Sequence, residues 1–192
     1  MISKLCLFLM TITKFMKKFL SIVCLLLLQL SFAQVKWMTI DEALKAQKEN
    51  PKKILIDFYA DWCGPCKIMD KKTYGHPVIA KILNENYYPV KFNAEEKNSI
   101  EIFGRTFSNP NTAQRKGRNS LHEFTQYMNV AAVPSTVFLD ETGGPITILQ
   151  GELSAKELEP YLELMSKDLF KKIKTREQWE DYQKKFKSNI KD

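Results

Sequence analysis

Two cysteines three residues apart could carry redox chemistry. Cys63 and Cys66 frame the tetrapeptide Cys-Gly-Pro-Cys, which follows an apolar run and precedes a segment of helical periodicity. A thiol at the start of a helix meets free backbone amides and the positive end of the helix dipole, which lower its pKa below the free value of about 8.5. Gly64 permits close approach, and Pro65 suits the first helical turn, where its missing N–H is not needed. We therefore expect Cys63 to be the nucleophile.

The spacing also places the second thiol one helical turn after the first. The Cys63 thiolate would attack a substrate disulfide, and Cys66 would resolve the mixed disulfide, leaving both cysteines oxidised. A purely structural bridge is a weaker interpretation, because so short a ring constrains the unfolded chain very little. The two cysteines could also form half of a zinc site. Zinc normally binds four ligands, however, and the only histidines after residue 33 are His76 and His122. We interpret these histidines as surface or helix-capping residues and expect no metal.

One acidic residue interrupts the apolar run before the cysteines. Residues 54–60 read Ile-Leu-Ile-Asp-Phe-Tyr-Ala, a pattern typical of a strand buried on both faces. A carboxylate is costly to bury and its pKa tends upward, which would suit Asp57 to act as a general base for the Cys66 thiol. The alternative is a capped or partly hydrated strand residue. By strand alternation, Asp57 points to the same side of the sheet as Tyr59.

Further patterns predict the elements that position this strand. A capping box at residues 39–42 predicts a helix that continues to Asn50 and is ended by Pro51. The other predicted elements are a helix from Cys63 that breaks near 75–77 and resumes over 78–86, a strand over 87–93, a short helix over 121–129, a hairpin of 136–139 and 146–149, and helices opened by capping boxes at 154–157 and 175–178. This order predicts an α/β sandwich around a mixed sheet.

Residues 95–120 are interpreted as an inserted surface loop, because their middle is polar, turn-rich and basic. In the short helix that follows, we expect four side chains to face inward. These are Leu121, Phe124, Tyr127 and Met128.

The first 33 residues resemble an export signal. From Met16, a short cationic start leads into a 14-residue apolar run over 19–32, with small residues at Ser31 and Ala33. We expect a secretory signal peptide cleaved after Ala33, with translation starting at Met16 and residues 1–15 an extension. The run is shorter than the about 20 residues of a spanning helix, so an uncleaved membrane anchor is the alternative.

Loss of this leader changes the charge balance. The chain has 29 Lys+Arg against 22 Asp+Glu, but residues 1–33 hold four lysines and no acid, so the net charge falls from +7 to +3. Four cysteines become two in the same step. With 44% hydrophobic residues, the composition argues against disorder and against a polytopic membrane protein. The basic clusters at 115–118 and 184–187 are interpreted as solvated faces, and we expect no nucleic-acid partner.

Residues 54–67 resemble the active-site segment of the thioredoxin superfamily almost throughout. The resemblance implies the thioredoxin fold, a central mixed β-sheet flanked by helices, here with an extra C-terminal helix. It implies that Val133-Pro134 is the family's cis-proline, whose loop faces the cysteines and pairs with substrate backbone. It also implies that Asp57 is the buried aspartate and Lys91 its lysine partner; otherwise Lys91 is a solvated strand-end residue. The residues implied to contact substrate are Trp62, Gly64, Pro65, Val133, Pro134 and Gly151, the last otherwise a plain turn glycine.

Residues 72–78 and the hairpin over 138–145 are more similar to periplasmic thioredoxin-like modules, such as the C-terminal domain of DsbD-type interchange proteins. A thioredoxin-like domain is expected over 34–168 and a helical extension over 169–192. The Gly-Pro between the cysteines resembles reducing members, which implies an oxidoreductase that reduces protein disulfides, and no cofactor is expected. The leader adds the expectation that this oxidoreductase is exported to the periplasm. Its expected partners are protein thiols and disulfides of the envelope and an unidentified upstream reductant, for which a membrane thiol transporter is a candidate; the protein is expected to be a monomer. The alternative is a non-catalytic binding module or holdase.

Overall fold

The computed structural model describes residues 16–21, 34–109 and 120–191. The chain divides into two units, residues 1–33 and 34–192. In the first unit, residues 16–21 are helical; the cleavage point predicted after Ala33 and the extension predicted over 1–15 lie outside the described residues. In the described part of the chain, no helix has the length and apolar character needed to cross a bilayer.

The second unit is built on a four-stranded mixed sheet with the strand order β2-β1-β5-β6. The central strand β1 (Lys53–Tyr59) runs parallel to β2 (Tyr87–Asn93) and antiparallel to β5 (Ser135–Leu139). The edge strand β6 (Pro145–Gln150) is antiparallel to β5. Every residue of β1 except Tyr59 is buried, which confirms the predicted central strand. The register places Asp57 of β1 between a residue of β2 and a residue of β5.

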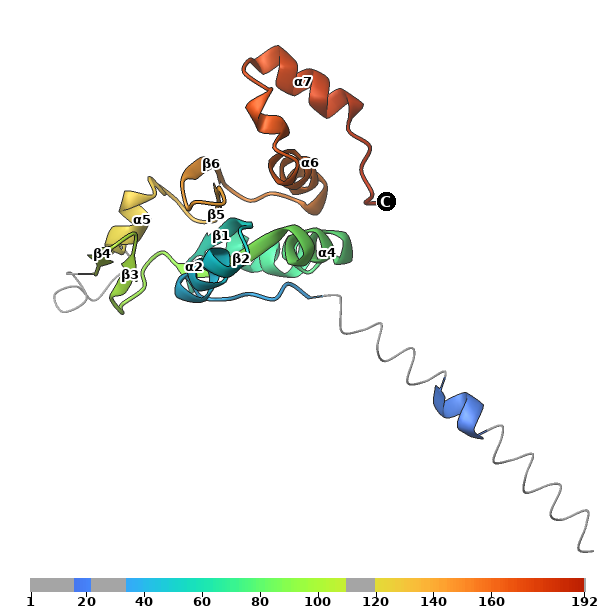
Figure 1. The fold of residues 1–192 in the computed structure, drawn as a ribbon, viewed down its shortest axis with the longest axis horizontal. Helices are drawn as coiled ribbons and strands as arrows, with labels where there is room; N and C mark the ends of the chain where they lie inside the picture. Colours follow the sequence, from blue (N-terminus) through green and yellow to red (C-terminus); the bar gives the residue numbers. More distant parts are fainter. Residues whose placement is uncertain (1–15, 22–33, 110–119, 192) are drawn as a thin grey trace, which may run out of the picture. The chain divides into compact units, whose positions relative to one another are not determined.

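Helices cover both faces of this sheet (Figure 1). The helices of this unit are α2 (Ile40–Glu49), α3 (Gly64–Met69), the π-helix η1 (Asp70–Tyr74), α4 (Pro77–Asn86), α5 (Glu123–Tyr127), α6 (Ala155–Ser166), the 3₁₀ helix η2 (Leu169–Lys171) and α7 (Arg176–Lys185). Ile56 and Phe58 share one hydrophobic core with α2 and α5, whereas Leu55 shares the other with α4 and α6. The capping boxes predicted at the starts of α2, α6 and α7 are all formed.

Within residues 95–120, the structure corrects the prediction of an irregular loop. The strands β3 (Ile100–Ile102) and β4 (Arg105–Phe107) form a two-stranded hairpin in which Ile102 and Phe107 are buried. This hairpin is hard to predict from the sequence because each strand has only three residues. In addition, Phe103 at the turn adopts a positive φ of 56°, which bulky residues rarely take. Residues 110–119, which include the basic cluster at 115–118, lie outside the described residues.

The hairpin also explains why the expected inward position of Tyr127 is wrong. Phe124 and Met128 are buried as predicted, but the Tyr127 side chain is 51% exposed. Its ring lies 5.1 Å from that of Phe107, and the Arg105 guanidinium lies 5.8 Å from its centre. Tyr127 therefore packs against the β3–β4 hairpin, which lies beside α5 in Figure 1, instead of entering the core.

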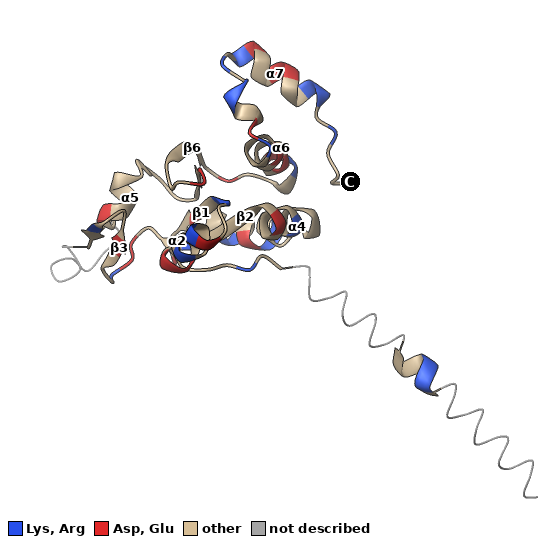
Figure 2. Ribbon diagram, in the orientation of Figure 1, with Lys and Arg blue, Asp and Glu red and all other residues tan. Residues whose placement is uncertain are grey.

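The C-terminal extension folds back onto α6. The ring of Trp179 in α7 stacks on Tyr161 of α6 at 4.7 Å and on its neighbour Tyr182 at 5.6 Å. Ile190, near the end of the chain, is buried in the same core as α4 and α6. Acidic and basic residues are interspersed along α7 (Figure 2).

Candidate redox site

Cys63 and Cys66 are joined by a disulfide where β1 gives way to α3. The S–S distance is 2.06 Å and the Cα atoms are 5.4 Å apart. Cys63 is the N-cap residue of α3, and its Sγ accepts a hydrogen bond from the Cys66 N–H at 3.2 Å. Pro65 occupies the first turn, as predicted. Both cysteines are almost fully buried, whereas Gly64 and Pro65 between them are exposed.

Three residues from the C-terminal half of the domain are connected to one another, and one of them contacts this disulfide. Val133 packs against the cysteine pair. The Val133–Pro134 peptide bond is cis, and the Pro134 carbonyl accepts a hydrogen bond from the Gly151 N–H at 2.9 Å. Gly151 has a φ of 96°, a conformation that favours glycine. Val133, Pro134 and Gly151 are therefore connected in space, and Val133 joins them to the cysteine pair.

Trp62 is the exposed aromatic residue beside the disulfide. Its side chain is 46% exposed, and its Nε1 donates a hydrogen bond to Glu95 Oε1 at 3.1 Å. The neighbouring Asp61 accepts a longer hydrogen bond from Asn93 Nδ2 at 3.5 Å. The segment just before the cysteines is thus hydrogen-bonded to the last residue of β2 and to Glu95, which follows that strand. Glu95 was not singled out from the sequence, because nothing local to it indicates this contact.

Asp57 is a buried carboxylate whose polar contacts are long. It is 2% exposed; its Oδ1 lies 3.5 Å from the Tyr74 hydroxyl and its Oδ2 lies 3.8 Å from Lys91 Nζ. Burial raises the pKa of Asp57 to about 7, because water that would stabilise the charged form is excluded. Lys91 opposes this increase in the pKa, and the negative charge of Asp70 adds to it. The direction agrees with the expectation for a carboxylate within β1.

Lys91 is shared between two carboxylates. Its Nζ forms an ion pair with Asp70 as well as the longer contact with Asp57. It also lies over two aromatic rings, 5.0 Å from the centre of Tyr59 and 5.5 Å from the centre of Trp37. Its side chain is 24% exposed, so Lys91 is partly buried and paired with carboxylates.

Asp70 and Trp37 also contact Lys91, and neither was expected at the site from the sequence. Asp70 begins η1, directly after α3. A signal for Asp70 was available, since it follows Cys66 by four residues and such residues share a helix face. Trp37 offered no comparable signal, because its contacts are made to residues far along the chain.

Both histidines cap helices. His76 Nδ1 accepts a hydrogen bond from the Val78 N–H at the start of α4, and His122 Nδ1 accepts one from the Phe124 N–H at the start of α5. The capping interpretation is confirmed, although His122 is fully buried and not at the surface.

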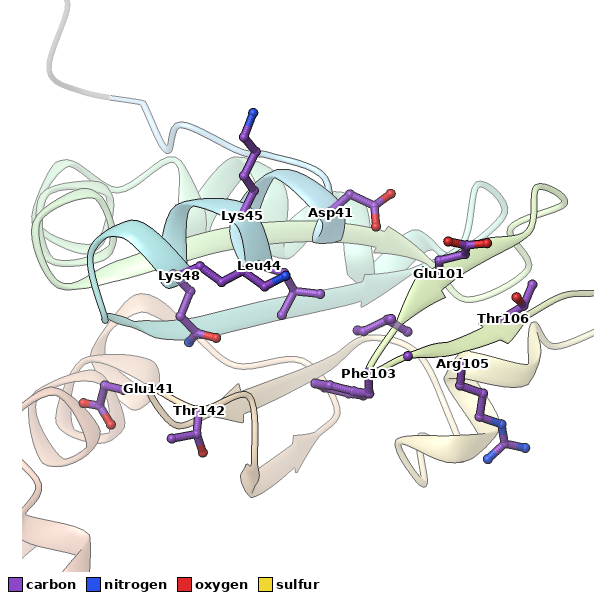
Figure 3. A pocket seen from close by; sticks show the side chains of 13 residues that line it. Asp41, Leu44, Lys45, Lys48, Glu101, Phe103, Arg105, Thr106, Glu141 and Thr142 are labelled. Atoms are coloured by element: carbon purple, nitrogen blue, oxygen red, sulfur yellow. The ribbon is translucent and has the colours of Figure 1, made fainter.

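A cavity of about 670 Å³ lies elsewhere, between α2, the β3–β4 hairpin and the turn at 141–142 (Figure 3). Leu44 and Phe103 line it together with charged residues of both signs, including Lys45 and Glu101. None of the residues discussed above as part of the redox site lines this cavity.

The fold and the site match a known family. The family model for the thioredoxin-like domain matches residues 40–166, more than half of the chain. The chain therefore belongs to the thioredoxin-like family, and its mixed sheet flanked by helices is the thioredoxin fold.

Individual relatives agree with this assignment. The thioredoxin-like protein YneN of Bacillus subtilis is 30% identical over 133 residues, which cover 64% of this chain and 71% of that protein. The thiol:disulfide interchange protein DsbD of Pectobacterium atrosepticum is 26% identical over 139 residues, or 71% of this chain. Thioredoxin-T of Drosophila melanogaster is 37% identical over 73 residues, or 38% of this chain. The chain spans 20% of the length of that DsbD protein and 45% of that of Thioredoxin-T.

Solved structures show the same fold. A thioredoxin-fold protein from Helicobacter pylori superposes with a TM-score of 0.53 at 17% identity, covering 70% of this chain and 81% of that one. The DsbH oxidoreductase gives a TM-score of 0.51 at 20% identity, covering 71% of this chain and 87% of that one.

Proposed function

We propose that this protein is an exported thiol-disulfide oxidoreductase that reduces protein disulfides through Cys63 and Cys66. The observation that carries the proposal is the disulfide closed at the start of α3, beside exposed residues and a residue of the cis-proline loop. Relatives named thiol:disulfide interchange protein support this chemistry. The leader-like first 33 residues support export to the periplasm, and 34–168 form the working domain.

In the proposed reaction, two electrons pass from the reduced cysteine pair to a substrate disulfide. The Cys63 thiolate attacks one substrate sulfur, a Cys63–substrate disulfide forms, and the other substrate sulfur leaves as a thiolate. The Cys66 thiolate then attacks Cys63 Sγ, which closes the Cys63–Cys66 disulfide and releases the second substrate thiolate. An upstream reductant of the envelope, with a membrane thiol transporter as a candidate, must then restore the dithiol.

Asp57 is the proposed general base for the second step. Its pKa of about 7 means that both the charged and the neutral carboxyl are populated near neutral pH, so it can accept the Cys66 proton and later release it. Lys91 stabilises the charged form that results. Trp62, Gly64, Pro65, Val133, Pro134 and Gly151 are the proposed substrate contacts.

Reduction of insulin disulfides by the dithiothreitol-recycled protein tests the proposal. The unsubstituted protein is expected to accelerate insulin precipitation, and Cys63→Ser is expected to reduce the rate to that of dithiothreitol alone. The matched variant Cys66→Ser retains the nucleophile and should accumulate a mixed disulfide, visible as an adduct on a non-reducing gel. Unsubstituted protein that is inactive yet still binds unfolded chains would instead support a binding module or holdase.

The direction of electron flow needs its own measurement. Equilibration with glutathione gives the reduction potential of the Cys63–Cys66 pair. We expect a reducing potential, nearer the −270 mV typical of thioredoxin than the about −120 mV typical of a dedicated oxidase. A potential as high as that of an oxidase would contradict the reductase assignment but leave the exchange chemistry intact.

A further inference from the structure

The segment before α2 adds to the edge of the sheet. The Met38 N–H donates a hydrogen bond to the Pro89 carbonyl at 3.0 Å, and the Lys91 N–H donates one to the Met38 carbonyl at 3.3 Å. The side chain of Asn84 fixes the same segment, because its Oδ1 accepts a hydrogen bond from the Lys36 N–H at 2.9 Å. The backbone on both sides of Trp37 is therefore held against β2 and α4.

This arrangement sets the Trp37 ring on two residues that contact Asp57. Its ring packs edge-to-face on Tyr74, with 4.9 Å between centres and an interplanar angle of 87°. The Lys91 ammonium lies over the same ring, 5.5 Å from its centre. Tyr74 and Lys91 are the groups whose polar atoms lie 3.5 Å and 3.8 Å from the Asp57 carboxylate. Trp37 itself is half-buried, so its ring covers part of Tyr74 and Lys91 while remaining partly exposed to solvent.

We propose that Trp37 is a positioning residue of the redox site, which keeps water from the buried Asp57 carboxyl and holds Lys91 beside it. This inference rests on the proposed function, since the proton affinity of Asp57 matters to catalysis only if Asp57 serves the cysteine pair. Trp37 acts through Asp57 and Lys91.

Two effects of removing the indole oppose each other. Water admitted to the cluster lowers the pKa of Asp57, whereas a loosened Lys91 ammonium raises it. Burial is the largest cause of the raised pKa, and Lys91 stays tied to Asp70 by its ion pair, so the first effect wins. The substitution leaves the chemical identity of the polar and charged groups around Asp57 and Lys91 unchanged; they are Asp70 and Tyr74 from η1, Tyr59 from β1, Lys91 from β2 and Thr136 from β5.

Titration of the Asp57 carboxyl by ¹³C NMR, in the full chain with oxidised cysteines, measures this directly. Trp37→Met retains much of the apolar volume but lacks the flat ring, and it should lower the Asp57 midpoint by about one pH unit, a fraction of the several units that burial can produce. Trp37→Phe retains an aromatic face and should lower the midpoint less. The pH profile of insulin reduction should move to lower pH in the same order.

Trp179→Met is the matched control, because it removes an indole that stacks in the C-terminal extension, away from Asp57. It should leave the Asp57 midpoint unchanged. A folded Trp37→Met or Trp37→Phe protein whose Asp57 midpoint is unchanged or raised would overturn the inference. Inactive unsubstituted protein would instead overturn the proposed function, and the NMR titration would still decide the role of Trp37.

Discussion

Two buried carboxylates, one in the redox site and one under the C-terminal tail, differ in the hydrogen bonds that they receive. Glu159 of α6 is fully buried and accepts hydrogen bonds from three donors of the tail: the Ser188 hydroxyl, the Asn189 N–H at 2.9 Å and Asn189 Nδ2 at 3.0 Å. Asp57 of β1 is as deeply buried, but its contacts with Tyr74 and Lys91 are long.

The number and length of the hydrogen bonds to each carboxylate indicate its role. Hydrogen bonds to a charged group stabilise it most when they are short and several, as at Glu159, which thereby fixes residues 188–190 to α6. Asp57 lacks such donors, so burial dominates and its pKa rises to about 7. A buried carboxylate with several short hydrogen bonds holds two segments of the chain together. A buried carboxylate with only long contacts can exchange a proton near neutral pH.

The largest expected effect is on stability at Asp57. In the unfolded chain the Asp57 carboxyl loses its proton near pH 4, whereas in the folded protein it does so only near pH 7. The folded protein therefore loses stability as the pH rises from 4 to 7, and above pH 7 it carries the full free-energy cost of burying the charged carboxylate. Asp57→Asn removes this cost and should stabilise the protein at pH 8 by an amount on the order of 4 kcal/mol, about three pKa units at 1.36 kcal/mol each. Denaturant unfolding at pH 8 and pH 4 checks this; equal effects at both would contradict it.

Neutralising Glu159 is expected to change the stability in the opposite direction. Glu159→Gln keeps the shape but removes the charge that the tail donors bind, so it should destabilise the protein by about 2 to 3 kcal/mol, the typical value of hydrogen bonds to a charged group. Equilibrium unfolding at pH 7 provides the measurement. A neutral or stabilising result would mean that Glu159 does not fasten the tail.

A smaller effect is expected when Asp70 is changed. The charge of Asp70 raises the pKa of Asp57, and Asp70 also draws Lys91 toward itself. Asp70→Asn removes both influences, so the Asp57 titration midpoint should fall by about one pH unit. ¹³C NMR of the carboxyl gives the midpoint, and a midpoint that rises would exclude this role for Asp70.

The smallest expected effect concerns one donor of the tail. Ser188→Ala removes one hydrogen bond to Glu159 but leaves those of Asn189, so a loss of about 1 kcal/mol is expected. Thermal unfolding of Ser188→Ala, compared with that of Glu159→Gln, shows whether the hydrogen-bond donors of the tail act together. A loss equal to that of Glu159→Gln would indicate that the Ser188 bond alone holds the tail.

Local patterns in the sequence predicted the parts of this structure that depend on local chemistry. The apolar run of β1, the Cys-Gly-Pro-Cys turn into α3 and the capping boxes each follow from neighbouring residues. The contacts of Trp37 with Lys91 and of Glu159 with Asn189 join residues 54 and 30 positions apart, so no local pattern marks them. The β3–β4 hairpin escaped prediction because Phe103 occupies a turn position that glycine or asparagine normally signals.

The pH dependence of insulin reduction, compared between the unsubstituted protein and Asp57→Asn, tests most directly the claim that Asp57 serves Cys63 and Cys66. The unsubstituted protein should show an inflection near pH 7, where Asp57 titrates. Asp57→Asn should be slower by about 100-fold, the lower end of what a general base contributes, and should lose the inflection. An Asp57→Asn protein with an unchanged rate and an unchanged pH profile would contradict the claim.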